Sequence, residues 1–449
     1  MTIHAGAATW ELASRAGTGR EAQVPANLTV DISIQYLEGG SRAGAVSPRE
    51  ARGRLRIAFE DLPLAMVLLG WDLPLRVVEA CAEECALQGA DLYLWQPLLT
   101  AHGSFQPDPA WYVVALNGHP VVGYAQRPEF TFVCPNRPDA REGVLHHLSA
   151  AIAGGFYRGV FLDRIRFPSP AGDLARQLGC FCDACREVSR QAGFDLSTVR
   201  QALLSLLASR EGRHASIRRL LSASSVQEPQ GPLQSLEHLM QFRQRSISAI
   251  VKEAAEIAIA GGLRVGLDCY TPTLARMVGQ DLPALATHCD WIKVMTYVRA
   301  YVPASLPFEI LGLADWLMGS GGESELAAMS CLAEATGWPL PACREEVRHG
   351  GLSPSILTEE VRRGRVSYAH PLLAGIELVE IPGVAEFSAD QIRIDAEAVL
   401  AGAPDGIVLS WDLMYMSANR LRLANFLYHC PTTPSPLTRP RAPTASHSH

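Results

Sequence analysis

The sequence predicts an α/β protein built as a (β/α)8 TIM barrel with insertions. Strand-like and helix-like segments alternate in one direction along the chain, and the strand-like segments number eight. Several are continuous apolar runs, which are typical of parallel strands buried on both faces. An open doubly wound sheet would need a ligand crevice, and no G-x-G-x-x-G follows the first strand-like segment to fill one. A closed barrel is therefore the expected architecture.

The strand-like segments are followed by helical patterns. PLAMVLLGWDL at 63–73 is the first, and apolar residues then recur three and four positions apart, as on one face of a helix. FTFVCPN at 130–136 is expected as the third strand, followed by a helix over 139–154. The other strands are expected at 90–99, 159–168, 263–272, 289–298, 372–383 and 405–416.

The domain organisation follows from changes in composition along the chain. The N-terminal segment is a mixture rich in Ala, Gly and Thr, and we expect it to be flexible. The C-terminal stretch cannot bury a core and is expected to be disordered. Within the barrel, the sequence turns at Asn117-Gly118, a pair typical of β-hairpins. The predicted parts are a flexible segment at 1–27, the barrel at 28–430 with a hairpin excursion at 111–125 and an insertion at 299–371, and a disordered tail at 431–449.

The bulk composition restricts the class of protein. The chain has 449 residues, of which 48% are hydrophobic and 19% charged, as in ordinary globular proteins. A net charge of −7 without a basic run argues against a nucleic-acid partner. No apolar stretch is long enough for a membrane span, and no secretory signal is visible. Eleven cysteines scattered through apolar segments suit reduced thiols in the cytoplasm.

Charged and aromatic residues gather where the predicted strands end, which is where TIM barrels place their chemistry. Carboxylates can act as acid, base or nucleophile, and aromatic faces pack against the C–H faces of sugar rings. Together they indicate a carbohydrate or glycoconjugate ligand. The candidates for catalysis or substrate binding are Asp72, Trp95, Asp163, Arg166, Asp268, Tyr297, Glu380, Trp411 and Asp412.

Asp163, at the end of the fourth predicted strand, is the principal catalytic candidate. We expect it to be the general acid/base of a two-carboxylate hydrolysis. Strands four and seven face each other across a barrel mouth, so Glu380 is expected as nucleophile or base. Glu377 lies on the opposite face of the same strand, and only one of the two can point inward. Asp268 and Asp412 compete for the second role.

Four residues are candidates for substrate binding beside these acids. Arg166 could hold a carboxylate or phosphate of the ligand through its bidentate guanidinium, or it could pair with Asp163 in a structural ion pair. Tyr297 is expected to hydrogen-bond the catalytic carboxylate. Trp95 and Trp411 suit a sugar platform, with core packing as an equal alternative.

A cysteine cluster follows the fourth predicted strand. Cys180, Cys182 and Cys185 form a C-x-C-x-x-C pattern, and three thiolates so close repel one another unless a soft cation holds them. Cys134 is the expected fourth ligand of a structural zinc site. A closed four-cysteine site has no open position for water, so the metal would pin the loop at the mouth. Unmetallated thiols and an iron–sulfur cluster are the alternatives.

Two motifs resemble those of known enzymes. LDRIRFP at 162–168 resembles the F-D-x-I-R-F-P motif of a glycoside-hydrolase-like TIM-barrel family, and MTY at 295–297 is similar to that group as well. The cysteine pattern is similar to the zinc cluster of family 42 β-galactosidases. Those enzymes carry an Asn-Glu pair where this chain has Asp163. The resemblance therefore implies the barrel and the metal cluster but not β-galactosidase activity.

The sequence predicts a glycoside hydrolase that works with paired carboxylates at the barrel mouth. One alternative is a carbohydrate-binding barrel without catalysis. Another is a barrel lyase, isomerase or aldolase in which Lys293, on the sixth strand, forms a Schiff base. Carboxyl groups about 5 to 10 Å apart would favour hydrolysis. Lys293 facing inward in an apolar pocket would favour Schiff-base chemistry.

Overall fold

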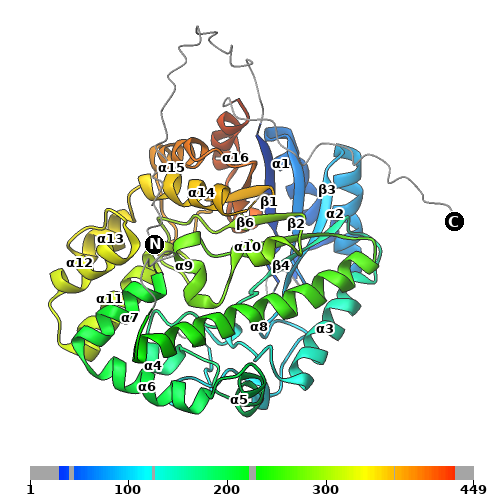
Figure 1. The fold of residues 1–449 in the computed structure, drawn as a ribbon. Coiled ribbons are helices and arrows are strands. Elements are labelled where there is room, and N and C mark those ends of the chain that lie inside the picture. The colour runs from blue at the N-terminus through cyan, green and yellow to red at the C-terminus, as the bar shows by residue number, and fades with distance from the viewer. Residues whose placement is uncertain (1–29, 40–44, 124–126, 222–228, 369, 430–449) are drawn as a thin grey trace, which may run out of the picture.

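The computed structural model describes residues 30–39, 45–123, 127–221, 229–368 and 370–429. Its strands form one closed parallel barrel in the order β1 to β8, surrounded by helices (Figure 1), and this confirms the expected TIM barrel. The terminal segments 1–27 and 431–449 lie outside the described residues. The strands are β1 (Asp31–Tyr36), β2 (Leu64–Leu69), β3 (Asp91–Pro97), β4 (Gly159–Asp163), β5 (Arg264–Cys269), β6 (Trp291–Val294), β7 (Leu372–Glu377) and β8 (Gly406–Ser410).

The strand that closes the barrel, β1, was not expected from the sequence. It pairs in parallel with β2 on one side and with β8 on the other. Its sequence, DISIQY, alternates: Ile32 and Ile34 belong to the core between barrel and helices, while Gln35 turns inward and contacts Lys293. Polar residues on the inward face break the continuous apolar run by which the other strands are recognised.

The expected third strand at 130–136 was wrong. Strand β3 pairs directly with β4, Leu94 opposite Val160, so no further strand fits between them. The 130–136 segment instead makes isolated antiparallel bridges with the chain before it, Thr100 with Phe132 and Tyr112 with Val133. Its apolar residues are buried against this excursion rather than in the barrel wall.

The helices pack around the barrel, and many begin with a side-chain cap. Ser388 and Gln391 form a reciprocal capping box at the start of α15. The helices are α1 (Pro48–Asp61), α2 (Leu75–Gln88), α3 (Pro138–Ile152), α4 (Leu174–Gln177), α5 (Asp183–Gln191), α6 (Leu196–Ala208), α7 (Arg210–Leu221), α8 (Pro232–Ala260), α9 (Pro272–Ala275), α10 (Leu282–Ala286), α11 (Leu306–Gly321), α12 (Glu325–Thr336), α13 (Arg344–Gly350), α14 (Ser355–Ser367), α15 (Ala389–Ala401) and α16 (Ala418–Ala424).

The insertion expected at 299–371 contains α11 to α14. Helix α14 packs against α15 and β7, so it occupies the place of a barrel helix. Helix α12 packs against α11 and α7 beside the barrel (Figure 1). Across the described ranges, no helix has both the length and the apolar character needed to cross a lipid bilayer.

The barrel interior has an apolar layer and a polar layer. Trp291 stacks on Phe161 with ring centroids 5.2 Å apart and meets the Tyr93 ring edge-on at 5.8 Å. Lys293 follows Trp291 by two residues on β6, and Asp268 lies beside it on β5. Both are also buried, but they form a polar layer. The apolar layer therefore closes the barrel, and the polar layer faces its carboxyl-terminal mouth.

Gly266→Ala tests this interior packing. A Cβ atom at position 266 would lie 2.2 Å from a ring carbon of Trp291, so the methyl group has no room without a shift of the ring. Overpacking of this kind typically costs about 1–3 kcal/mol, and we expect a lower melting temperature. Gly53→Ala in α1 is the matched control, because no atom lies within 4 Å of its new Cβ. Equal melting temperatures for the two variants would contradict the packing.

Candidate active site and metal centre

A cavity of about 120 Å³ opens at the carboxyl ends of the strands. Asp163 ends β4 and Asp268 lies near the end of β5, and their preceding residues, Leu162 and Leu267, are paired across the two strands. The two acids therefore lie side by side on the cavity wall. The predicted residues that line this cavity are Trp95, Asp163, Arg166, Asp268, Tyr297 and Trp411.

The Asp163 carboxylate accepts two N–H hydrogen bonds. The indole Nε1 of Trp95 donates to Oδ2 at 3.0 Å, and the backbone N–H of Arg164 donates to Oδ1 at 2.5 Å. Both donors fix the orientation of the carboxyl group at the cavity wall. Within the described residues, no ion pair joins Asp163 to Arg166, whose guanidinium instead packs on Phe132 and Tyr270. The structure therefore does not support the alternative of a structural ion pair.

The residue after Asp163 explains how its backbone amide reaches the carboxylate. Arg164 has a φ of +53°, in the left-handed region, where strain of about 1–3 kcal/mol is usual for a residue other than glycine. Its guanidinium is fixed by Thr100 Oγ1 at 3.1 Å, by the carbonyl of Glu129 at 2.9 Å and by the ring of Phe130. Sequence reasoning passed over Arg164, although it directly follows the principal catalytic candidate.

Asp268 belongs to a buried network around Lys293. The ammonium of Lys293 donates to Asp268 Oδ2 at 3.0 Å, to the Tyr297 hydroxyl at 2.6 Å and to Gln35 Oε1 at 3.2 Å. Burial raises the pKa of Asp268 to about 7; the Lys293 charge opposes this rise and the Asp163 charge adds to it. The other oxygen, Oδ1, is buried and has no hydrogen-bond partner among the described residues.

The Lys293 amine is held in its charged form. Burial opposes that charge, but Asp268 and Tyr297 outweigh the burial and raise the pKa of Lys293 above its ordinary value. A Schiff base requires a neutral amine. Lys293 does face inward, but its surroundings are polar rather than apolar, so the structure favours a charged structural role. Tyr297 is bound to this lysine and not to a catalytic carboxylate.

The structure does not bring Glu380 to the cavity. Glu380 lies beyond the end of β7, where its side chain is 45% exposed and pairs with Arg420 at 3.1 Å. Glu377, two positions after Gly375 on the inward face, is the buried acid of this strand. Its carboxylate accepts the backbone N–H groups of Arg299 and Ala300 at 2.9 and 3.0 Å, and burial raises its pKa to about 7. The expectation that Glu380 faces Asp163 is therefore not met.

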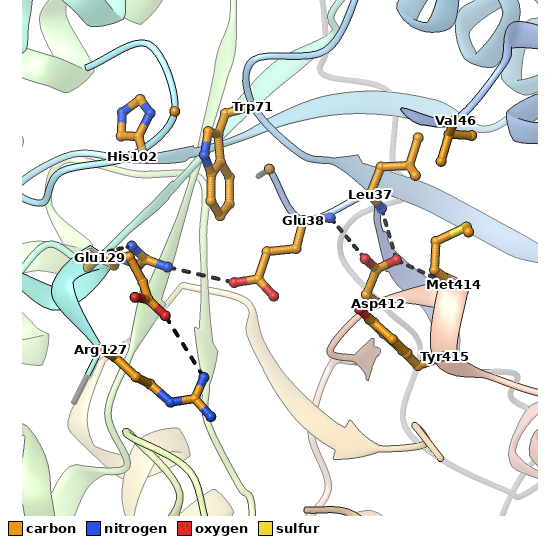
Figure 2. A pocket seen from close by; sticks show the side chains of 13 residues that line it. Leu37, Glu38, Val46, Trp71, His102, Arg127, Glu129, Asp412, Met414 and Tyr415 are labelled. Atoms are coloured by element: carbon orange, nitrogen blue, oxygen red, sulfur yellow. Dashed lines mark hydrogen bonds and ion pairs between the residues drawn. The ribbon is translucent and has the colours of Figure 1, made fainter. Parts of the chain in front are cut away.

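Asp412 and Asp72 also lie apart from this cavity. Asp412 accepts the backbone N–H groups of Leu37 at 2.9 Å and Glu38 at 3.0 Å, so it ties the end of β1 to the loop after β8 (Figure 2). Asp72 accepts a hydrogen bond from the backbone N–H of Ser104 at 3.0 Å, and it lines a separate hollow between α2, β3 and α3. Both carboxylates are engaged in holding loops.

Glu38 is an acid at the mouth that sequence reasoning missed. It lines the first cavity and also a larger neighbouring cavity of about 630 Å³. Figure 2 shows its side chain extending away from Asp412, towards the side where Arg127 and Glu129 lie. Partial removal of water by the cavity walls raises the pKa of this carboxyl group, and the charge of Arg164, whose Nη2 lies 3.6 Å from Glu38 Oε1, opposes the rise. Its side chain keeps 43% exposure, so a ligand in either cavity can reach it.

Glu38 was missed because β1 was missed. Glu38 lies two positions beyond the end of β1, and this position at the carboxyl end of a barrel strand places it at the mouth. The alternating polar residues of DISIQY were the available signal, since they mark a strand with one polar face.

The four predicted metal-ligating cysteines come together and could hold a metal ion. Their sulfur atoms all lie within 4.8 Å of one another, and all four residues are buried. Cys134 Sγ lies 3.3 Å from Cys185 Sγ and 3.6 Å from Cys182 Sγ, far longer than a disulfide bond. Zinc–sulfur bonds of about 2.3 Å in a tetrahedron would place the sulfurs roughly 3.8 Å apart. The cluster is therefore close to the size of a tetrahedral metal site.

Hydrogen-bond donors surround these sulfur atoms. The backbone N–H of Val114 donates to Cys180 Sγ at 3.3 Å, and Asn136 Nδ2 donates to Cys185 Sγ at 3.3 Å. Cys182 caps α5 and accepts the N–H of Cys185 at 3.5 Å. Donors of this kind stabilise thiolates, which are the form that binds a metal.

Comparisons with known proteins show the fold. Neither a protein-family model nor a curated protein matches this chain. The chain is similar to the solved PgaB (BpsB) glycoside hydrolase domain from Bordetella bronchiseptica, with a TM-score of 0.53 and 13% identity over 88% of this chain and 98% of that one. It is also similar to a β-galactosidase from the psychrophilic Marinomonas ef1, with a TM-score of 0.51 and 10% identity over 88% of this chain, but it spans only 59% of that protein. At these identities the similarity establishes the barrel fold.

The pH dependence of stability tests the protonation of Asp268. Its pKa is near 7 in the folded chain and near 3.8 when unfolded, so the folded chain binds more protons between those values. Stability therefore falls as the pH rises through this window. Between about pH 5 and pH 8, the free energy of unfolding measured in urea is expected to fall by roughly 2 kcal/mol less in Asp268→Asn than in the native chain. Glu38 and Glu377 contribute in the same direction and remain.

Glu380→Gln is the control for this measurement. The pKa of Glu380 is lowered by hydrogen bonds from Ser417 and Arg420, so it does not titrate in the same window. This variant should keep the pH dependence of the native chain. An unchanged slope in Asp268→Asn would show that Asp268 is ionised throughout.

Proposed function

We propose that the protein is a glycoside hydrolase whose reaction is carried by Asp163 and Glu38. The proposal depends on one observation: these two acids line the same cavity at the barrel mouth, where two N–H donors fix Asp163 and Glu38 stays 43% exposed beside Arg164. Trp95 and the Arg164 amide each donate a hydrogen bond to Asp163 and fix the direction in which its carboxyl group points. Partial desolvation raises the pKa of Glu38, and the negative charges of Asp412 and Asp163 add to the rise.

The two environments suit the two tasks of glycoside hydrolysis. One carboxyl group protonates the leaving oxygen, and the other attacks the anomeric carbon or activates water. A carboxyl group whose surroundings raise its pKa is suited to the role of proton donor. We assign the proton donor to Glu38 and the nucleophile or base to Asp163, whereas strand position alone had suggested the acid/base role for Asp163.

Asp268 competes with Glu38 for the role of acid. Both pKa values are near 7, but Asp268 Oδ1 is buried and Oδ2 is bound to Lys293. Glu38 is accessible from both cavities, so a leaving sugar could extend into the larger cavity while its neighbour contacts Asp163. We therefore place Asp268 as a positioning residue that holds Lys293 and Tyr297. Trp411 and Tyr297 would contribute apolar surface for the sugar.

Hydrolysis of aryl glycosides by matched variants tests these roles. Asp163→Asn is expected to reduce kcat by about 10²-fold or more on every substrate that the native chain cleaves. Glu38→Gln should reduce kcat by as much on glycosides with poor leaving groups. It should reduce kcat little on dinitrophenyl glycosides, because dinitrophenolate departs without a proton. Its pH profile should also lack the alkaline decline that deprotonation of the acid gives the native chain.

The control is Glu380→Gln, which lies outside the cavity and should leave kcat unchanged. Full activity in Asp163→Asn would rule out its role. Loss in Asp268→Asn without loss in Glu38→Gln would move the acid to Asp268. Sugar binding without hydrolysis of any glycoside would support the carbohydrate-binding alternative.

We also propose that Cys134, Cys180, Cys182 and Cys185 hold a structural zinc ion. Four thiolates and no other ligand leave no open coordination position, so the ion takes no part in the reaction. It would join the segment that carries Cys134 to the loop before α5 and to the first turn of that helix. No disulfide joins any of the ten cysteines in the described part of the chain, and we infer a reducing compartment, the cytoplasm, on that basis.

Cys182→Ser tests the metal. The native chain purified with a reductant should carry about one zinc per chain, measured by elemental analysis, and Cys182→Ser should carry much less. Its melting temperature should fall, because loss of a structural metal removes folding free energy. Cys331→Ser changes a buried cysteine outside the cluster and should keep the zinc. A native chain without metal would end this proposal.

A further inference from the structure

Arg166 is a buried cation on the wall of the catalytic cavity. The residue is 3% exposed, and its guanidinium packs against the rings of Phe132 and Tyr270, with centroids 4.5 and 4.9 Å away. Its one hydrogen bond within the described residues goes from Nη1 to the carbonyl of Phe167 at 3.3 Å. A guanidinium has five N–H donors, so most of its donors have no partner within the described parts of the protein.

The acids nearest to Arg166 are already supplied with other donors. Asp268 is bound to Lys293, and Asp163 to Trp95 and the Arg164 amide. Glu309 accepts from the Tyr270 hydroxyl at 2.8 Å and from the Ala304 amide at 3.1 Å, as well as from Ser169. The Arg166 charge acts on Asp268 and Glu309 without an ion pair. A buried cation with no ion-pair partner is costly unless an anion joins it.

We propose that Arg166 binds an anionic group on the sugar, and that the substrate is an acidic glycoside such as a uronide. The N–H groups of a guanidinium lie in one plane and match the two oxygens of a carboxylate. Arg166 lines the same cavity as Asp163, so the charged sugar would be the one that Asp163 contacts. The inference depends on the proposed hydrolysis only in calling this ligand a substrate.

A second role would also explain a cation here, and it makes a different prediction. Arg166 could act only by stabilising the negative charge of the catalytic acids. In that case its removal would affect charged and neutral sugars alike. Recognition of an anionic group instead affects charged sugars and leaves neutral ones unchanged, so the comparison between sugars separates the two roles.

Calorimetric binding of methyl glucuronide and methyl glucoside, in both anomers, tests the inference. The Asp163→Asn chain is used so that no ligand is cleaved. Glucuronide should bind about tenfold or more tightly than glucoside, and Arg166→Gln should remove that difference while glucoside binding stays the same. Arg166→Lys keeps the charge without the bidentate geometry and should restore only part of the preference.

Arg127→Gln is the matched control. Arg127 lines the same cavity, but its side chain is 45% exposed and pairs with Glu129 at 3.9 Å. This variant should keep the preference for glucuronide. Glucose 6-sulfate and inorganic sulfate form the second arm of the experiment. If glucose 6-sulfate binds tightly through Arg166 and glucuronide binds weakly, the anionic group that Arg166 recognises is a sulfate ester rather than a carboxylate.

The outcomes separate this inference from the proposed hydrolysis. Equal binding of charged and neutral sugars, or equal weakening of both in Arg166→Gln, would overturn it. Glucuronide binding that depends on Arg166, without hydrolysis of any aryl uronide, would leave the inference standing and the hydrolase proposal refuted. Hydrolysis of neutral glycosides without preference for uronides would support the hydrolase proposal and refute the role of Arg166 in binding an anionic sugar.

Discussion

The barrel interior depends on the hydrogen bonds that the buried ammonium group of Lys293 donates. An unpaired charge inside a protein is very unfavourable, so this lysine needs the acceptors that Asp268, Tyr297 and Gln35 provide. These acceptors come from β5, from the chain after β6 and from β1, so one cation joins distant parts of the barrel. Gly375 on β7 leaves the space, because a Cβ there would lie 2.9 Å from the lysine Cε. The network also marks the level at which aromatic packing ends and the cavity begins.

The same polar layer explains what the sequence could and could not predict of the fold. Strands such as β2 and β8 face apolar neighbours on both sides, and their continuous apolar runs are easily recognised. Strand β1 presents Gln35 to Lys293, so its pattern alternates and it was overlooked. The apolar segment at 130–136 was taken for a strand because burial in an excursion leaves the same signal as burial in a barrel wall. A hydrophobic pattern predicts that a segment is buried, but it does not predict which part of the protein covers that segment.

The site was predictable where position along a strand decides it. Asp163 ends β4, and it lines the cavity as expected. The cysteine cluster was predictable for a similar reason, because short spacing keeps three of its members together in any fold. Whether an acid is free depends on loop amides that no pattern reveals. Asp412 accepts hydrogen bonds from the backbone amides of Leu37 and Glu38. Glu377 accepts them from the amides of Arg299 and Ala300.

The position of β1 sets a limit on how far the chain can be shortened. This strand pairs with both β2 and β8, so it hides the edges of two neighbours at once. A chain beginning after Tyr36 would open the ring and expose two rows of unpaired backbone N–H and C=O groups. Unprotected strand edges pair with edges of other molecules. Such a truncated protein would aggregate rather than merely lose activity.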